Sequence, residues 1–253
     1  MQLQPESNQT EPAGPRSHTS FTAGASFYDA IYAAKGKNYA SEVEYVRRVI
    51  QKVKKSSGNR LLETACGTGA HTQHLVNQFD VVGLDKDREM LAIARQRLPG
   101  VRFYEADMAN FALNDRFDVV ICLFSSIGYV RKLERFRQAI RTMSEHLVPG
   151  GVLVVEPWLT PEEFHPGKVF ATFVDQPELK IARMNVNVLR DGMSILDFNY
   201  LVCSPEGVRH FTEHHELGLF THAQHVAAFR DSGLETSFDP SGVIARGLYI
   251  GIR

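Results

Sequence analysis

The chain has 253 residues, enough for one large domain or two small ones, and its 43% hydrophobic and 23% charged residues suit a globular protein with a sizeable core. The formal net charge of −1 provides no field that would favour nucleic acid or an anionic membrane surface. No apolar run approaches the roughly 18–20 residues that span a bilayer, no secretory signal opens the chain and the three cysteines are far apart, so we expect a reduced, cytoplasmic protein.

The first residues differ in composition from the rest. Residues 1–24 are rich in proline, glycine, serine, threonine and glutamine and show almost no apolar periodicity. Such a segment buries too little apolar surface to offset the entropy lost on ordering, so we expect it to be disordered. The remainder, 25–253, is predicted to form a single domain. It begins with a short helix around Phe27 to Tyr32 and a longer helix over 39–55 with a valine-rich stripe.

Short apolar strands and helices then alternate along the chain. The expected strands are 61–65, 80–85, 101–105, 117–124 and 152–156, the last entered through a sharp turn at Pro149-Gly-Gly151. The expected helices are 70–78, 89–97 and 132–147. Continuous apolar strands separated by helices are typical of a parallel sheet covered on both faces, so the predicted fold class is α/β with a Rossmann-like sheet.

The pattern changes after the fifth strand. Four strand-like runs follow, at 168–175, 180–190, 194–202 and 209–220, and Asp191-Gly192 between the second and third is a hairpin signal. This block, about 165–220, is predicted to be an antiparallel extension or lid. A helix over 222–232 and a last strand over 247–252 return the chain to the core, which therefore comprises about 39–157 plus 222–253.

A loop with two glycines follows the first strand, with the sequence ETACGTG from Glu63 to Gly69. Gly67 and Gly69 lack a Cβ, so the backbone can pass close to a ligand, and the helix that follows presents free N–H groups to an anionic group. Such a loop alone is weak evidence, because many strand-to-helix turns contain it for packing. A dinucleotide site is disfavoured, since its G-x-G-x-x-G pattern needs a third glycine and residues 71–74 contain none.

Acidic residues stand at the ends of the next two strands. Asp85 can accept hydrogen bonds from both hydroxyls of a ribose, although Asp85 or Asp87 could instead cap the following helix. Asp107 can accept a hydrogen bond from the exocyclic amine of adenine, and Met108 offers a backbone N–H and an apolar wall. In series with the glycine loop, these residues predict a nucleoside lying across the edge of the sheet.

Five segments in order, ETACGTG, GLDKDREML, EADM, FDVVICLFSSIGY and LVPGGVLVVEP, resemble the motifs of class I S-adenosylmethionine-dependent methyltransferases over about 60–157. The resemblance implies an enzyme with S-adenosyl-L-methionine as cofactor. That family often has aspartate at the first position of the glycine motif, where this chain has Glu63.

A narrower resemblance covers nearly the whole of 25–253. FYDAIYAAKGKNYASEV, LFSSIGY, VVEPW, GVRHF and PSG…RGLYIG resemble the N,N-dimethyltransferases that act on nucleotide-linked amino sugars in macrolide antibiotic pathways. It implies that Tyr28 lies near the sulfonium and the substrate amine and that Arg246 approaches the substrate. Two departures affect the substrate side: Tyr129 stands where the family often has histidine, and residues 243–245 are additional.

The predicted site therefore has two parts. The resemblance implies Tyr28, Tyr129 and Arg246 as catalytic residues, and no metal is expected. The implied cofactor-binding residues are Tyr39, Glu63, Ala65, Gly67, Gly69, Asp85, Lys86, Asp107, Met108 and Leu123.

The predicted partner is a small-molecule amine, first of all a nucleotide-linked amino sugar, and neither nucleic acid nor a membrane. Another amine, such as a peptide N-terminus or an amino-acid-derived metabolite, and an oxygen acceptor are the alternatives, and a non-catalytic cofactor-binding module is the competing class. Tyr129, Glu156 and His210 are candidates for a base that assists the amine. A homodimer is compatible with the sequence, which does not decide the oligomeric state.

A few other residues allow two interpretations. The histidines between 210 and 225 look like a metal cluster, but aspartate and cysteine partners are missing and a half-exposed strand face is favoured. Trp158 fits either stacking on a substrate or core packing. Lys35, Lys37 and Arg190 could bind a substrate phosphate, although lysines and arginines more often face water.

Overall fold

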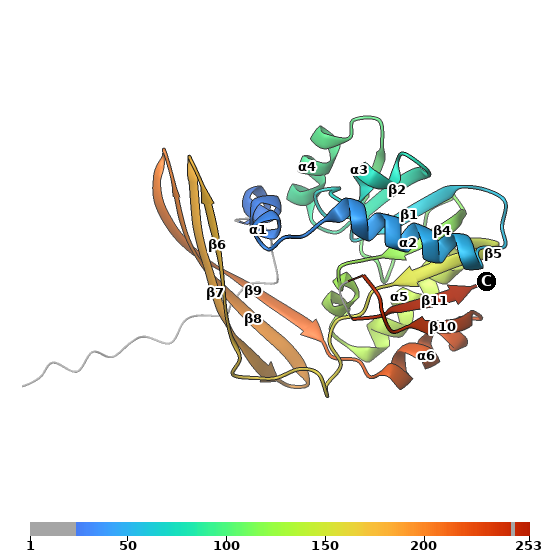
Figure 1. The fold of residues 1–253 in the computed structure, drawn as a ribbon. Helices are drawn as coiled ribbons and strands as arrows, with labels where there is room; N and C mark the ends of the chain where they lie inside the picture. Colours follow the sequence, from blue (N-terminus) through green and yellow to red (C-terminus); the bar gives the residue numbers. More distant parts are fainter. Residues whose placement is uncertain (1–23, 244–245) are drawn as a thin grey trace, which may run out of the picture.

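The computed structural model describes residues 24–243 and 246–253, and it consists of two sheets with helices around one of them (Figure 1). The prediction made for the N-terminal segment falls on residues outside this range, except for Gly24. A seven-stranded sheet forms the core, and a long four-stranded sheet stands beside it. Helix α1 (Tyr28–Ala34), preceded by the 3-10 turn η1 (Ala25–Phe27), packs against the second sheet at β6 (Val169–Gln176).

The core sheet has the strand order β10-β11-β5-β4-β1-β2-β3. Strands β1 to β5 pair in parallel, whereas β11 is antiparallel to both β5 and β10. The strands are β1 (Arg60–Thr64), β2 (Asp80–Asp85), β3 (Arg102–Glu105), β4 (Phe117–Cys122), β5 (Leu147–Val155), β10 (Glu235–Asp239) and β11 (Leu248–Ile252). This confirms the predicted α/β class with a parallel-dominated sheet.

Both faces of this sheet are covered, which explains the continuous apolar runs in its strands. Along β4, Val120 and Cys122 belong to one buried cluster, and Val119 and Ile121 belong to the cluster on the opposite face. The helices that follow the parallel strands are α3 (Thr72–Leu75), α4 (Arg88–Arg97) and α5 (Leu133–Glu145), with the 3-10 turn η2 (Ser126–Val130) after β4. Two further helices, α2 (Tyr39–Val53) and α6 (His222–Asp231), complete the cover.

The second sheet is an antiparallel meander of β6, β7 (Leu179–Arg190), β8 (Met193–Ser204) and β9 (Gly207–Gly218). Asp191 and Gly192 join β7 to β8 with positive φ angles of 51° and 72°, the left-handed conformation that a tight hairpin turn requires. The predicted antiparallel extension is therefore confirmed. Strand β9 packs on η2, so the extension contacts the end of the core sheet.

Three local features differ from the predictions. The helix expected over 70–78 is the single turn α3, because Gly69 adopts a left-handed φ of 73° and the chain must return to β2 at Asp80. The turn at 149–151 lies within β5, where the Gly150 N–H and carbonyl groups hydrogen-bond to other segments. Strand β10 was not predicted, since an edge strand paired on one side needs little apolar periodicity.

Among the described helices, none has both the length and the apolar content needed to cross a bilayer.

Candidate active site

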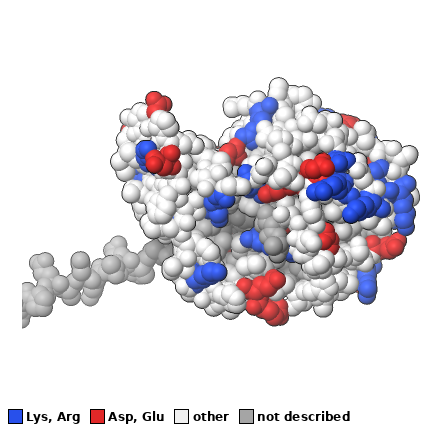
Figure 2. All heavy atoms as spheres, in the orientation of Figure 1, with Lys and Arg blue, Asp and Glu red and all other residues white. Residues whose placement is uncertain are grey.

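A cavity of about 730 Å³ lies between the C-terminal ends of the parallel strands and the antiparallel sheet. Figure 2 shows the hollow between these two parts, with lysine and arginine side chains along it. One half is formed by the loops after β1, β2 and β3, and the other by α1, η2 and the inward faces of β6 to β9. The topology therefore places a nucleoside-sized space at the strand ends and a second space next to it.

The two glycines of the loop after β1 have different roles. Gly67 has a φ of 55° and lines the cavity, and a Cβ at this position would meet no atom within 4 Å. Gly69 has a φ of 73°, but a Cβ there would lie 3.3 Å from the Cβ of Ala94 in α4. Gly67 thus exposes the backbone to a ligand, whereas Gly69 permits close packing of loop and helix. Ala65, which lines the cavity, also has a positive φ of 54°, a conformation that is costly for a residue with a Cβ.

Asp85 lines the cavity at the end of β2 and fixes the glycine loop. Its Oδ2 accepts the Gly67 N–H at 2.8 Å and its Oδ1 accepts the Asp87 N–H at 2.8 Å. Burial raises the pKa of this carboxyl above its ordinary value. The cap of α4 is Asp87, which accepts the N–H groups of Glu89 and Met90, so the capping interpretation of Asp85 is wrong. Asp85 keeps lone pairs for a ligand hydroxyl, and Lys86 lines the cavity beside it.

Asp107 and Met108 line the same half after β3. Asp107 Oδ1 accepts the Ala109 N–H at 2.8 Å, and Oδ2 receives a hydrogen bond from Arg135 at 2.7 Å. An adenine amine that binds Asp107 must therefore share this carboxylate with Arg135, which also lines the cavity.

Four of the predicted cofactor residues, Tyr39, Glu63, Gly69 and Leu123, are not among the described residues that line the cavity. Glu63 is 2% exposed and lies behind the loop, where it accepts a hydrogen bond from Thr72 at 2.5 Å, and burial raises its pKa to about 8. The Tyr39 ring packs edge-on against His71, and Leu123 is buried in the core. These side chains support the wall from behind, and their direct contact with a cofactor stays a prediction.

Tyr28, Tyr129 and Arg246 all line the second half of the cavity, so the structure brings the three predicted catalytic residues together. Burial raises the pKa of both tyrosines well above the ordinary value, so their hydroxyls stay protonated. Arg246 donates to Ser125 Oγ at 2.6 Å, and its guanidinium lies 4.4 Å from the ring centroid of Trp158. Trp158 lines the cavity and is stacked on this arginine.

Comparison with known proteins agrees with this geometry. A family described as "Methyltransferase domain" matches residues 61–151. The chain is 37% identical over 230 residues to the dTDP-3-amino-3,4,6-trideoxy-alpha-D-glucopyranose N,N-dimethyltransferase of Streptomyces venezuelae, covering 90% of this chain and 97% of that one. It is 37% identical over 246 residues to the dTDP-3-amino-3,6-dideoxy-alpha-D-glucopyranose N,N-dimethyltransferase of Streptomyces fradiae, covering 93% and 96%.

The chain belongs to this methyltransferase family. The crystal structure of Streptomyces venezuelae DesVI superposes with a TM-score of 0.86 at 36% identity, covering 90% of this chain and 98% of that one. The structure of S-adenosylmethionine-bound CalS10, an amino pentose methyltransferase from Micromonospora echinaspora, gives 0.82 at 36% identity, covering 90% and 96%. The resemblance drawn from the motifs is confirmed, and S-adenosylmethionine is the cofactor.

The methyltransferase also contains cavity residues that the sequence did not reveal. Arg183 points inward from β7, is 6% exposed, and its guanidinium lies 4.5 Å from the Phe198 ring centroid and 5.4 Å from that of Tyr32. A charged residue at an inward position of an alternating strand is the signal that could have identified it. His215 does not line the cavity, but it lies directly behind the wall, since its Nδ1 is 3.0 Å from the Tyr129 hydroxyl.

The three cationic residues suggested for binding a phosphate have different surroundings in the structure. Lys35 lines the cavity. Lys37 also lines it, but its ammonium binds both carboxylate oxygens of Glu42, at 2.8 and 2.6 Å, so it is already paired. Arg190 is exposed at the end of β7 and is not among the described residues of the cavity wall.

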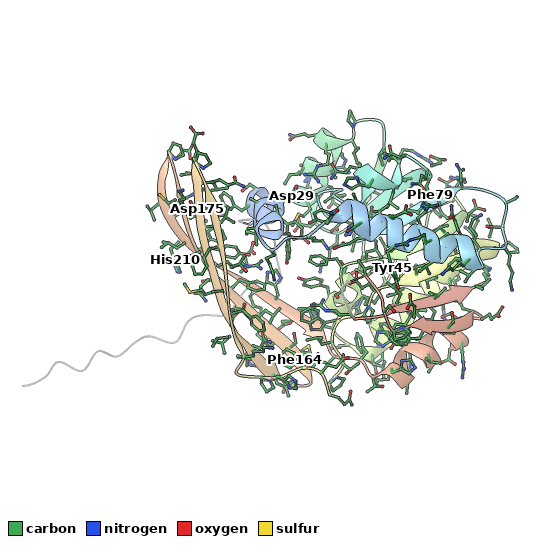
Figure 3. The ribbon with its side chains drawn as sticks, viewed as in Figure 1. Asp29, Tyr45, Phe79, Phe164, Asp175 and His210 are labelled. Carbon is green, nitrogen blue, oxygen red and sulfur yellow. The ribbon has the colours of Figure 1, made fainter. Side chains whose placement is uncertain are left out.

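The histidines after residue 209 are dispersed. His210 is exposed on β9 in the antiparallel sheet, away from the core (Figure 3), and is not part of the described cavity wall. His214 contacts Asp197 at 2.6 Å, and His222 contacts the Tyr249 hydroxyl at 2.9 Å. No group of three metal-ligating side chains occurs within residues 24–243 and 246–253. The hypothesis that His210 assists as a base is therefore not supported by its position.

Proposed function

We propose that this methyltransferase transfers methyl groups from S-adenosylmethionine to the amino nitrogen of a nucleotide-linked amino sugar in secondary metabolism. The relatives that align over nearly the whole chain carry names of dTDP-amino-sugar N,N-dimethyltransferases. The observation on the molecule that carries the proposal is a group of three cations in the second half of the cavity: Lys35, Arg183 and Arg246. The coulombic effect of both arginines contributes to lowering the pKa of Lys35, after the larger effect of burial.

These three cations suit a diphosphate. Among the described residues, none of them has a carboxylate within ion-pair distance, in contrast to Lys37 with its partner Glu42. A nucleoside diphosphate carries negative charge that such a group attracts, and arginines match phosphate oxygens with fixed donors. The cations would anchor the nucleotide, leaving the sugar to extend toward Tyr28 and Tyr129.

The protein has little covalent chemistry to perform, since the cofactor supplies an activated methyl group on its sulfonium. Proximity and alignment are the main contribution of the enzyme, with the reacting atoms about 3–3.5 Å apart. The protonated hydroxyls of Tyr28 and Tyr129 can orient the amine through hydrogen bonds, and the rings of Tyr32 and Phe124, 4.9 Å apart between centroids, wall the site from water.

Incubation with S-adenosylmethionine and dTDP-3-amino-3,6-dideoxyglucose tests the proposal, with product detected by mass spectrometry as the addition of one or two methyl groups. Transfer to this acceptor, with a Michaelis constant that rises at least about tenfold in Arg183→Gln, supports it, because a lost charged hydrogen bond costs about 1.5–3 kcal/mol. Transfer to a simple amino acid or peptide N-terminus but not to the sugar nucleotide would refute the acceptor class. Transfer to none of these amines, despite binding of the cofactor, would favour an oxygen acceptor or a non-catalytic role.

We also propose that the enzyme is a homodimer. Support comes from apolar side chains on the outward face of the second sheet, where Val169, Phe173 and Met184 are 73%, 66% and 48% exposed. Ala171 pairs with Met184, and Val169 with Val186, so these side chains form contiguous rows on neighbouring strands. Apolar area of this kind on a globular protein marks a contact surface, and a second copy presents the same rows.

A further inference from the structure

A chain of buried polar side chains leads from the cavity wall into the antiparallel sheet. Tyr129 in η2 forms part of the wall, and its hydroxyl lies 3.0 Å from Nδ1 of His215 in β9. Nε2 of the same imidazole lies 3.5 Å from Oε2 of Glu213. His215 is 1% exposed and Glu213 is 4% exposed. Of these three side chains, Tyr129 alone belongs to the described cavity wall.

The geometry follows from the alternation of β9. Glu213, His215 and Leu217 occupy every second position and are all buried, whereas His214 and Glu216 between them are partly exposed. The buried face packs on η2, which brings His215 against Tyr129 although the two residues are 86 positions apart.

The carboxylate of Glu213 is held in place by two donors. Its Oε1 accepts the Gly24 N–H at 2.8 Å, and its Oε2 accepts the Tyr200 hydroxyl at 2.7 Å. With the imidazole proton on Nε2, the nitrogen that lies 3.5 Å from this carboxylate, Nδ1 accepts the hydrogen bond of the Tyr129 hydroxyl. The Phe198 ring, 5.0 Å away between centroids, packs against the imidazole and limits its rotation.

Several other ionisable groups surround this pair. Burial has the largest effect on Tyr129 and raises its pKa; among the nearby charges, Glu213 raises this pKa further and Arg183 lowers it. The groups that face Tyr129 and His215 are Tyr28 and Tyr32 of α1, Lys86 after β2, Arg183 of β7, Tyr200 of β8 and Glu213 of β9.

We propose that Tyr129, His215 and Glu213 form a proton relay that neutralises the amine of the substrate inside the cavity. The proposal rests on the amine methylation proposed above and adds the route of the proton. The bound ammonium gives one proton to the Tyr129 oxygen while the hydroxyl proton of Tyr129 passes to His215 Nδ1. Tyr129 ends neutral, and the imidazolium lies beside the Glu213 carboxylate.

The rest of the reaction balances. The freed lone pair on nitrogen forms the new N–C bond, the S–C bond breaks with its electron pair on sulfur, and the sulfonium becomes a neutral thioether. The product is a methylammonium ion that carries the methyl group. When it leaves, the imidazolium returns its proton through Tyr129 to water, so each methyl transfer releases one proton. Because burial raises the pKa of Tyr129, a free phenolate is not the acceptor, and the concerted passage to His215 replaces it.

The second methylation needs the relay as much as the first. A monomethylated amine that stays or rebinds as an ammonium ion must again lose a proton before it can attack. A site without the relay depends on the fraction of amine that arrives neutral from water. An amine flanked by oxygen-bearing carbons is expected to titrate near the α-amino value of about 8, so this fraction is small at neutral pH and large above about pH 9.

The test compares the intact enzyme with His215→Gln at about pH 7 and about pH 9.5, on either side of that titration. The substrate is dTDP-3-amino-3,6-dideoxyglucose, and turnover is measured with saturating S-adenosylmethionine. We expect turnover of the variant to fall about tenfold at the lower pH, because an amine that titrates near 8 is only about one-tenth neutral there, and to come within about threefold of the intact enzyme at the higher pH. Monomethylated product should accumulate in the variant at the lower pH only.

Two further variants separate the relay from a structural role. Tyr129→Phe removes the first link while keeping the ring and His215, and its loss of turnover should be about tenfold larger at about pH 7 than at about pH 9.5, on top of any loss from amine orientation that is equal at both pH values. His225→Gln is the matched control, because His225 is equally buried at 1% exposed but stacks on Tyr249 away from the described cavity wall. Its turnover relative to the intact enzyme should be the same at both pH values.

An equal loss of turnover at both pH values in His215→Gln and Tyr129→Phe would overturn the relay and leave a positioning role. Unchanged turnover at about pH 7 would overturn it as well. Failure of the intact enzyme to methylate the sugar nucleotide at either pH would instead refute the proposed acceptor. Should His215→Gln fail to fold, as shown by circular dichroism, Tyr129→Phe decides the question by itself.

Discussion

The substitution Asp85→Asn tests the cofactor half of the cavity. Asp85 holds two backbone N–H groups, from Gly67 and Asp87, each at 2.8 Å, and is predicted to accept hydrogen bonds from a ribose. An asparagine offers one oxygen in place of two, so one loop N–H loses its acceptor, at a cost of about 1–3 kcal/mol. A ribose hydroxyl that donated to the charged carboxylate loses about 1.5–3 kcal/mol of binding energy. Because about 1.4 kcal/mol corresponds to a factor of ten, the affinity for S-adenosylhomocysteine should fall about 10–100-fold.

Isothermal titration calorimetry with S-adenosylhomocysteine measures this loss, and a thermal melt without ligand measures the loss of stability separately. Asp87→Asn is the matched control, since it removes the same charge two residues away while asparagine caps a helix as well as aspartate does. The control should bind within about threefold of the intact enzyme. Unchanged affinity in Asp85→Asn, or an equal loss in both variants, would refute the predicted ribose contact.

Three further predictions concern the loop, the buried carboxylate and the outer sheet face. Gly67→Ala places a Cβ on a residue with a φ of 55°, which costs about 1–2 kcal/mol, and it puts a methyl group into the cavity. Calorimetry should therefore show at least about tenfold weaker binding of S-adenosylhomocysteine, and binding within a factor of two would contradict this. Burial raises the pKa of Glu63 to about 8 in the folded protein, so ionisation of this carboxyl in the unfolded chain lowers the free energy of unfolding as the pH rises from about 4.5 to about 8. Urea denaturation should therefore find Glu63→Gln more stable than the intact enzyme at pH 8 but not at pH 5. An equal difference in stability at both pH values would exclude this carboxyl as the cause. Phe173→Lys on the outward face of β6 should convert the proposed dimer to a monomer in analytical ultracentrifugation, whereas persistence of the dimer would remove this face from the interface.

The core sheet was predictable because its signals are local. Each parallel strand is a short apolar run, and each acidic residue of the site lies at or just after the end of its strand: Asp85 is the last residue of β2, and Asp107 lies two residues beyond β3. Parallel strands end on the same edge, so sequence order alone places these carboxylates along one line. The division between Gly67 and Gly69 was not predictable, because it depends on Ala94 in α4 meeting one position and not the other.

The substrate half was less predictable because its contacts join distant segments. Arg183 enters the cavity through the inward face of β7, and His215 meets Tyr129 across a packing contact between β9 and η2. The alternation of a strand shows which residues share a face, but it does not show which face meets the core. A charged residue among apolar ones on one face therefore indicates a functional residue, but the sequence does not show which part of the molecule it faces until the position of the sheet is known.

The two halves of the cavity are built from different parts of the fold, and this affects specificity for the methyl acceptor. The cofactor half depends on strand ends that any sheet of this type presents, and its Asp85 and Gly67 contacts are internal to the core. The second half combines η2 of the core with β7 and β9 of the antiparallel sheet, so a change in how the two parts pack would alter the acceptor space while leaving the cofactor space intact. Substitutions in β7 or β9 should therefore change the choice of acceptor and the pH dependence, whereas substitutions at the loops after β1 and β2 should change cofactor affinity for every acceptor alike.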